Sequence, residues 1–390
     1  MIRKTTLTLL LLIAVTSSIY AQHKISGTLS DKTTGSAVAF ATVQLKNAKS
    51  TLTNENGEFE ISCPSLPAIV LISHLNYQSI SIQVSTTDQP LKIKLVPQVV
   101  TLKDVTVGNP AIAIMQEASN KAYQIKNQSF YGRAFLRQIA YEGEEPTYMN
   151  EIFFDAEWKP FSMVKWHPTQ ARHLQGANKL SYDNMSFITF ISSGYLSNNE
   201  FTKPMARRVD SLYNFKLVAS YQQNGQEIVK INCIPKSGSK PKKLQFHGYY
   251  YVNTVTNDVL KIEGDIKGLK LSGWGPLTFK NKMATFSAQY KLNAEGFNVL
   301  DYVIFNTSNL FKIAGIKAKT TDVYSTLCMI DEQAGDKSEL KSINIQINDS
   351  DLARKLSYTD EFWKNNQVIK RTEKEQTAIE ILEKIPQVRK

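Results

Sequence analysis

Side chains that carry metal or nucleophilic chemistry are sparse in this chain of 390 residues, which has five histidines and three cysteines. A catalytic zinc takes three protein ligands, two of them usually close in sequence. No H-E-x-x-H pattern occurs, and His167 and His173 stand in a stretch that we interpret as loop. The sequence therefore predicts no metal site and no cofactor.

Carboxylates that could form an acid–base pair occur in two hydrophilic stretches, Glu142 with Glu144 and Glu145, and Asp349 with Asp351. Glycoside hydrolysis needs two carboxylates at a fixed separation, and such pairs are assembled in space. There is no G-x-S-x-G motif and no glycine-rich phosphate loop. We therefore predict that the protein is not an enzyme, with an unrecognised hydrolase as an alternative.

Aromatic side chains are a further group of binding candidates. Tyr249 and Tyr251 follow His247 closely, and Trp274 lies between two glycines that leave its ring room to stand clear. Aromatic faces can support sugar rings or acyl chains, although alternating tyrosines in a sheet also pack in the ordinary way. We take these three aromatic residues as candidate ligand-binding residues.

The first residues have the composition of a secretory signal peptide. A positive start at Met1–Lys4 precedes an apolar run, Leu7–Val15, and a small-residue exit that ends at Ala21. The apolar run is too short to span a bilayer as a helix. We expect export with cleavage after residue 21, and no transmembrane helix.

Basic residues are concentrated in the middle of the chain. The formal net charge is +11, and the segment Lys159–Lys243 contains thirteen bases against four acids. Such a segment could attract anionic lipid or acidic glycan, or it could be a solvated surface. Nucleic acid is a poor partner for an exported protein. The basic candidates for ligand binding are Arg207, Arg208, Lys242 and Lys243.

The three cysteines, Cys63, Cys233 and Cys328, are too few for a disulfide framework. We interpret them as strand residues that are partly buried. A single bridge between Cys233 and Cys328 is the alternative in an oxidising compartment.

The stretch 24–107 has the pattern of a small all-β module. Asn56-Gly57 predicts a tight hairpin turn with positive φ at both positions, and Phe59 and Ile61 alternate with glutamates after it. Further strands are expected at Ile69–Ser73 and Leu91–Leu95.

This module resembles the carboxypeptidase-like regulatory domain, a seven-stranded transthyretin-like sandwich. The matching residues fall in the family's three motifs and are Gly27, Asp31, Thr34, Gly35, Ala41, Val43, Thr53, Asn54, Gly57, Phe59, Asn76 and Tyr77. The segment Leu102–Val107 is similar to the one that follows this module in outer-membrane nutrient receptors, but the remaining chain is too short for their barrel. The resemblance implies an envelope protein of a Gram-negative cell, periplasmic, outer-membrane associated or secreted.

The rest of the chain predicts a second domain that is mainly β. Asn109-Pro110 starts a linker helix, 108–126, and residues 127–335 alternate with period two between turns such as Asn224-Gly225. We expect a curved antiparallel sheet or half-barrel, whose mouth is covered by short helices and loops in Phe161–Arg208. Residues 336–390 form a C-terminal segment with an amphipathic helix over Thr372–Ile385.

The second half also resembles exported proteins in which the regulatory module, here 22–107, precedes a β-rich domain of unknown function. The residues that carry this likeness are Asn109-Pro110-Ala111, Phe130-Tyr131, Arg133, Arg137, His247–Val252 and Phe362-Trp363. The favoured function is a non-enzymatic envelope protein that binds a protein partner or an amphiphilic or glycan ligand. A lipid or lipopolysaccharide carrier with a half-barrel cavity is the alternative.

Overall fold

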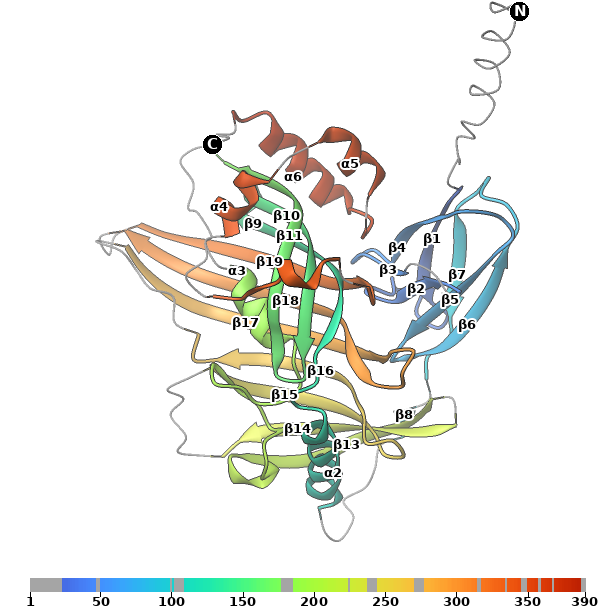
Figure 1. The fold of residues 1–390 in the computed structure, drawn as a ribbon, viewed down its shortest axis with the longest axis vertical. Helices are drawn as coiled ribbons and strands as arrows, with labels where there is room; N and C mark the ends of the chain where they lie inside the picture. The colour runs from blue at the N-terminus through green and yellow to red at the C-terminus, as the bar shows by residue number, and fades with distance from the viewer. Residues whose placement is uncertain are drawn as a thin grey trace, which may run out of the picture. The chain divides into compact units, whose positions relative to one another are not determined.

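The chain is described by a computed structural model that covers residues 23–46, 50–98, 100–101, 109–176, 185–223, 225–236, 244–269, 277–313, 317–333, 335–344, 349–356, 359–366 and 368–386. It divides into two compact units, Met1–Val96 and Pro97–Lys390 (Figure 1). The first unit therefore ends before Val107. The predicted signal peptide and the predicted strand Leu102–Val107 lie outside the described residues.

The first unit is a β-sandwich of seven strands, as the sequence predicted. One sheet has the order β4-β1-β7 and the other β3-β2-β5-β6. Alternating side chains from both sheets, including Ile25, Phe59 and Ile72, are buried between them. The strands are β1 (His23–Asp31), β2 (Thr42–Leu45), β3 (Ser50–Leu52), β4 (Glu58–Cys63), β5 (Ala68–His74), β6 (Tyr77–Val84) and β7 (Leu91–Leu95).

The turn at Asn56-Gly57 differs from the prediction. It joins β3 to β4, which belong to different sheets, so it makes a crossing between the two layers and not a hairpin. Positive φ is found at Gly57, with 74°, but not at Asn56. Asn54 closes the turn with its side chain and its backbone. Its Oδ1 accepts hydrogen bonds from the amides of Asn56 and Glu58, and its carbonyl accepts from the amide of Gly57.

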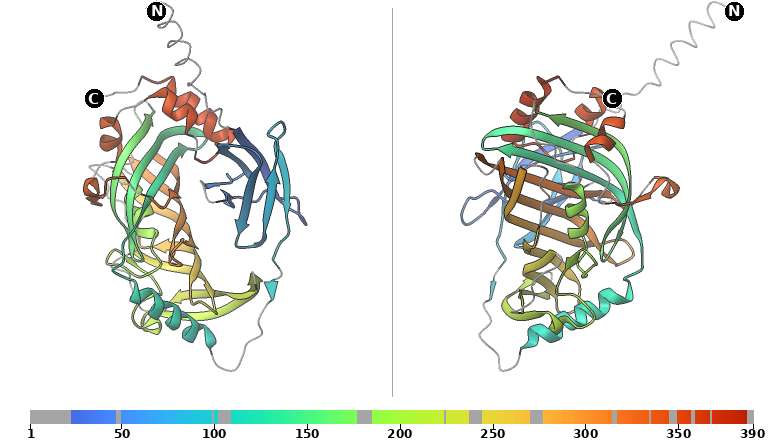
Figure 2. Two further views of the ribbon diagram at one scale, coloured as in Figure 1. Left: turned by 45° about the vertical axis from the view of Figure 1, so that its right-hand side comes forward. Right: turned by 90° about the vertical axis from the view of Figure 1, so that its left-hand side faces the viewer.

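The second unit is built on one sheet of thirteen strands, which is strongly curved (Figure 2). Its main path is β20-β11-β10-β9-β19-β18-β17-β16-β15-β14-β13-β8, with β12 beside β15. The prediction of a curved, mainly antiparallel sheet is confirmed. The strands are β8 (Val100–Thr101), β9 (Phe130–Glu142), β10 (Glu145–Lys159), β11 (Ser162–Gln175), β12 (Phe201–Thr202), β13 (Tyr213–Gln223), β14 (Gln226–Pro235), β15 (Leu244–Asn253), β16 (Val259–Lys267), β17 (Leu277–Leu292), β18 (Asn298–Ile313), β19 (Lys317–Asp331) and β20 (Lys341–Ser342).

The stretch Phe161–Arg208 is more regular than predicted. Its first part is the long strand β11, which pairs with β10 along its length. A β-bulge beside Pro168 shifts the register and lets the pairing continue past the proline. A short helix, α3 (Met185–Ser192), follows. Among the described residues of this stretch, α3 and the loop after it agree with the predicted short helices and loops.

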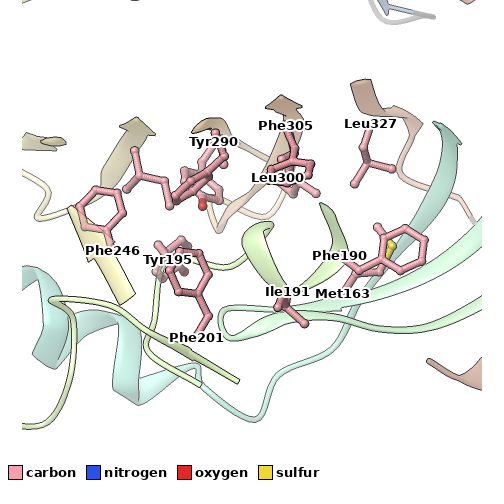
Figure 3. Close-up of a cluster of buried hydrophobic side chains, with 14 of the residues drawn as sticks. Met163, Phe190, Ile191, Tyr195, Phe201, Phe246, Tyr290, Leu300, Phe305 and Leu327 are labelled. Carbon is pink, nitrogen blue, oxygen red and sulfur yellow. The ribbon is translucent and has the colours of Figure 1, made fainter. Parts of the chain in front are cut away.

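One face of the sheet, here called the inner face, is filled by helices and a loop. The linker helix α2 (Pro110–Gln124) begins at the cap Asn109 as predicted and buries Met115 and three alanines. Rings from the loop after α3 meet rings of the sheet, and Tyr195 lies 5.0 Å from Tyr290 between ring centroids (Figure 3). Period-two alternation supplies the apolar side chains of the sheet, and α2, α3 and the loop supply the opposing layer.

The opposite, outer face is covered over β9, β10 and β11 by the end of the chain. The helix α6 (Glu373–Glu383) buries Ala378, Ile379 and Leu382 against Met149 and Leu174. Its cap Thr372 forms a capping box with Glu375. Two shorter helices precede it, α4 (Asp349–Lys355) and α5 (Asp360–Asn365), and short 3-10 helices lie at η1 (Val209–Ser211) and η2 (Lys337–Glu339).

All three cysteines are free and buried, which confirms the interpretation as strand residues. The alternative bridge is wrong for a topological reason. Cys233 lies on β14 and Cys328 on β19, and β15, β16, β17 and β18 stand between these strands in the sheet.

Candidate functional site

A cavity of about 500 Å³ opens at one end of the sheet, here called the rim cavity. β9 starts there and β10 and β19 end there, since Phe130 pairs with Trp158 and Arg133 with Asp331. The turn between β17 and β18 completes the wall. The lining residues are Gln128, Ser129, Phe130, Tyr131, Trp158, Lys291, Asn293, Ala294, Glu295, Val299, Leu300, Met329, Asp331, Glu332, Gln333 and Lys337.

Trp158 fixes the apolar floor of the rim cavity. Its side chain is 1% exposed, and its Nε1 donates a 3.2 Å hydrogen bond to the carbonyl of Ser193. Phe130 packs on the indole with ring centroids 5.7 Å apart, and Tyr195 packs on it at 5.9 Å. The floor is therefore continuous with the aromatic core and cannot collapse into the cavity.

Charged side chains stand around this floor. Lys291 pairs with Asp301 at 3.2 Å, and this carboxylate raises the pKa of the ammonium. The ammonium of Lys337 lies 3.9 Å from the centroid of the Tyr131 ring. Asp331 lies 3.9 Å from the guanidinium of Arg133. The cavity thus combines an apolar floor with a polar entrance, the usual composition of a small-ligand site.

A second cavity of about 190 Å³, here called the α2 cavity, lies beside the same end of the sheet. Lys121 of α2 pairs with Asp258 at 2.7 Å on its wall. Asn298 is buried there, and its Nδ2 donates a 2.6 Å hydrogen bond to the carbonyl of Val259. Among the described residues, its Oδ1 has no hydrogen-bond partner. The lining residues are Ala118, Lys121, Ala122, Gln124, Ile125, Tyr195, Asn257, Asp258, Val259, Gly296, Phe297 and Asn298.

The candidate tyrosines Tyr249 and Tyr251 lie elsewhere, on the outer face of β15. Lys230 lies 4.1 Å from the ring centroid of Tyr249, and the Tyr251 hydroxyl donates a 2.5 Å hydrogen bond to Glu263. Burial would raise the pKa of Glu263, but Lys261 and Lys230 outweigh it and hold the pKa at about 2. Tyr249 also lines a hollow of about 330 Å³ over β16, β17 and β18. Tyr251 therefore contacts a packed cluster of charged side chains, whereas Tyr249 lines an open hollow.

The basic segment does not form one surface in the described residues. Arg207 and Arg208 are exposed beside η1, and Arg208 lies 3.8 Å from Asp210. Arg172 is buried under α6. Lys203 is buried too, with its ammonium donating to the carbonyls of Ile191, Ser192 and Gly194 at the end of α3. Period-two alternation sends neighbouring bases to opposite faces. Trp274, Lys242 and Lys243 lie outside the described residues.

A dense charge cluster occupies the outer face of β9, β10 and β11. Glu151 is 1% exposed and accepts from Arg137 at 2.8 Å, Arg172 at 2.5 Å and Arg371 at 3.2 Å. Burial would raise the pKa of Glu151, but the three guanidiniums outweigh it and hold the pKa well below its usual range. Glu375 and Glu383 of α6 balance the remaining positive charge. Each charge has a partner from the chain, so the cluster fastens α6 to the sheet.

Among the carboxylates considered for catalysis, Glu142 and Glu145 are partners across the hairpin between β9 and β10, and Glu142 and Asp349 are bonded within the chain. Asp349 is buried and accepts hydrogen bonds from the amide and the hydroxyl of Ser186, so it caps the start of α3. Glu142 pairs with Lys319 at 2.7 Å, and Glu144 is almost fully exposed. Within the described ranges no three histidine, cysteine, aspartate or glutamate side chains gather as metal ligands. Among the helices of the described residues, none is long and apolar enough to span a bilayer.

The residues of the two cavities were not selected from the sequence. Trp158, Phe297 and Asn298 were not among the candidate residues. Lining residues come from the ends of six strands, from α2, from η2 and from the loop after α3, so no local motif unites them. The turn residues between long apolar strands were the only sequence signal that could have indicated these cavities.

Two family matches divide the chain near the boundary of the compact units, although the first match extends past Val96. A CarboxypepD_reg-like domain matches residues 25–107, and a family of unknown function, DUF5686, matches residues 115–325. The first match agrees with the resemblance seen in the sequence. No curated protein matches the chain.

Solved structures show only a distant likeness. A DUF1329 family protein from Desulfovibrio piger is 11% identical, with 57% of this chain and 94% of that chain covered and a TM-score of 0.23. A LolA superfamily protein from Nitrosomonas europaea is 13% identical, with 59% and 97% covered and a TM-score of 0.20. Scores this low establish no shared function. Because DUF5686 matches more than half of the chain, the protein belongs to this family of unknown function.

Proposed function

We propose that this protein is an exported, non-enzymatic envelope protein whose second unit binds a small amphiphilic or glycan ligand in the rim cavity. The observation that carries the proposal is a volume of about 500 Å³ whose floor is aromatic and whose entrance is polar. Cavities of this size and mixed lining are typical of sites for small organic ligands.

The filling of the inner face favours binding at the rim over transport in the interior. Met115 of α2 and Phe190 of α3 are fully buried against the sheet. A lipid carrier of the half-barrel type would need these elements to move away from the sheet. Such a movement would expose a large apolar surface to water, at about 25 cal/mol per Å².

The rim cavity offers a direct test through Met329, which lines it. Met329→Lys places an ammonium over the floor, whereas Met283→Lys changes an exposed methionine on β17 of the same sheet. Mature protein purified without detergent is analysed by native mass spectrometry for bound ligand. It is then titrated with N-phenylnaphthylamine as an apolar probe and with neutral tetrasaccharides.

We expect at least one probe class to bind, with affinity lowered about tenfold or more by Met329→Lys, which is about 1.4 kcal/mol. Met283→Lys should bind like the wild type. Binding that survives Met329→Lys, or the absence of binding by either class, would contradict the proposal. Turnover of glycan or peptide substrates, abolished by a carboxylate substitution, would contradict its non-enzymatic part.

Export rests on the signal peptide expected at Met1–Ala21. Expression of the full chain in a Gram-negative host, followed by fractionation and N-terminal sequencing, tests it. The mature protein should begin at Gln22 and be recovered from the envelope or periplasmic fraction. A cytoplasmic protein that retains Met1 would contradict this part of the proposal.

A further inference from the structure

We propose that the ligand is an uncharged oligosaccharide that occupies both the rim cavity and the α2 cavity, with Phe297 between two sugar subsites. This inference rests on the proposed function and names its ligand class. It is carried by three independent features, namely the lining of the rim cavity, the charge around both cavities and the position of Phe297 and Asn298.

The lining of the rim cavity combines nine polar or charged side chains with seven apolar or aromatic ones. Phe130, Trp158 and Leu300 are among the apolar members, and Ser129 and Gln333 are among the polar ones. A sugar ring presents C–H groups on its faces and hydroxyl groups around its edge. Amides, hydroxyls and carboxylates can donate to or accept from those hydroxyls, while aromatic rings accept the apolar face.

The charge around the cavities disfavours an anionic ligand. The rim cavity is lined by two lysines and three acids, and the α2 cavity by one lysine and one aspartate. Lys291 is already paired with Asp301, and Lys121 with Asp258. A phosphate or carboxylate would meet more negative than positive charge, which costs affinity. The two cavities therefore fit an uncharged saccharide better than a phosphorylated headgroup.

Phe297 connects the two cavities. Its ring lines the α2 cavity and packs on Phe130 of the rim cavity, with centroids 5.7 Å apart. Gly296, with φ of 81°, allows the tight turn that presents this ring. A ligand longer than a disaccharide can thus place sugar units on each side of the Phe130–Phe297 pair.

Asn298 supplies the polar anchor of the second subsite. It is 4% exposed, and its Nδ2 is held by the carbonyl of Val259, which fixes the amide plane. Asn298 lines the α2 cavity, and its buried Oδ1 has no hydrogen-bond partner among the described residues. A buried acceptor of this kind is costly when left unpaired, and a sugar hydroxyl would satisfy it.

Isothermal titration of the mature protein tests the inference. The probes are maltotetraose, cellotetraose, chitotetraose and mannotetraose, their disaccharides, and lysophosphatidylglycerol below its micelle concentration. At least one tetrasaccharide should bind more tightly than its disaccharide. Asn298→Leu should weaken the tetrasaccharide about tenfold and leave the disaccharide unchanged, since only the longer ligand reaches the α2 cavity.

Two further variants keep the test independent of folding effects at Asn298. Phe297→Ala should also weaken the tetrasaccharide about tenfold. Leu292→Ala, an exposed residue just before the same turn and outside both linings, should bind like the wild type. Thermal unfolding of every variant shows whether it is folded at the titration temperature.

The outcomes separate this inference from the proposed function. If only lysophosphatidylglycerol or N-phenylnaphthylamine binds, and Met329→Lys abolishes it, the saccharide assignment is overturned while the proposed function stands. If a tetrasaccharide binds equally well to Asn298→Leu and Phe297→Ala, the second subsite is overturned. If no probe binds the wild type, both proposals fail.

Discussion

Polar side chains gather at two places on the same sheet, the Glu151 cluster and the rim cavity. The two places differ in what these side chains contact. Glu151 is enclosed by three arginines of the chain, two of them on the sheet and one before α6. The side chains of the rim cavity instead face a volume of about 500 Å³. A saturated set of charges holds a fold together, whereas a lined volume is available to a ligand.

Basic residues of the most basic segment have different roles in the structure. Arg172 and Lys203 belong to the most basic segment, yet both are buried and bonded within the chain. Lys337, which comes from a less basic part, is the lysine that stands over Tyr131 at the cavity. Local charge density in the sequence therefore does not translate into one continuous basic surface among the described residues.

The largest expected effect comes from Glu151→Gln, which leaves Arg137, Arg172 and Arg371 without their shared buried carboxylate. Removing one member of a buried ion cluster costs about 3–5 kcal/mol of the free energy of unfolding. Urea unfolding monitored by circular dichroism measures this cost. Glu144→Gln, at an exposed glutamate of the neighbouring turn, should change it by less than about 0.5 kcal/mol. If the two variants changed the free energy of unfolding equally, the Glu151 cluster would not stabilise the fold more than an exposed turn does.

Acid should destabilise the outer face of the sheet through Glu263. The pKa of Glu263 is about 2 in the folded protein, against 4.5 in the unfolded chain. The unfolded state therefore binds more protons in this window, so stability is present above pH 4.5 and is lost as the pH falls toward 2. Each such proton contributes a slope of about 1.4 kcal/mol per pH unit. Glu263→Gln should flatten the fall measured by urea unfolding between pH 5 and 2, and an unchanged slope would contradict this.

A smaller effect is expected at the start of α6, the helix over the Glu151 cluster. Thr372→Ala removes a side chain that accepts from the amide of Glu375, at a cost of about 1 kcal/mol. Thr359→Ala is the matched control, because the cap Thr359 makes no such bond to α5. Thermal unfolding should separate the two variants. Equal melting temperatures would show that the capping box does not help to hold α6 on the sheet.

The smallest effect is expected from salt on ligand binding at the rim cavity. An uncharged ligand releases no counterions, so its affinity should change less than about twofold between 50 and 500 mM salt. Isothermal titration of the bound saccharide measures it, with Lys337→Ala as a second probe of charge. A steep loss of affinity with salt would mean that the ligand is anionic and that Lys337 acts as its partner.

Local patterns predicted much of the fold because they depend on neighbours along the chain. Asn109-Pro110 started α2 as expected, and the strand Leu91–Leu95 lies where its alternation predicted. The turn at Asn56-Gly57 was wrong because a hairpin and a crossing between sheets use the same turn residues. The strand β11 was missed because Pro168 interrupts its alternation at a bulge.

By itself the sequence determined two β-rich units, a linker helix and a helical end, since these follow from alternation, capping and composition. Only the tertiary structure decided which side chains meet. Phe130, Trp158 and Phe297 come from strand ends far apart in the chain, and curvature of the sheet with its α2 and loop layer brings them together around a cavity. Burial likewise decided that Arg172 and Lys203 stabilise the fold, because a charge removed from water must be paired within the protein.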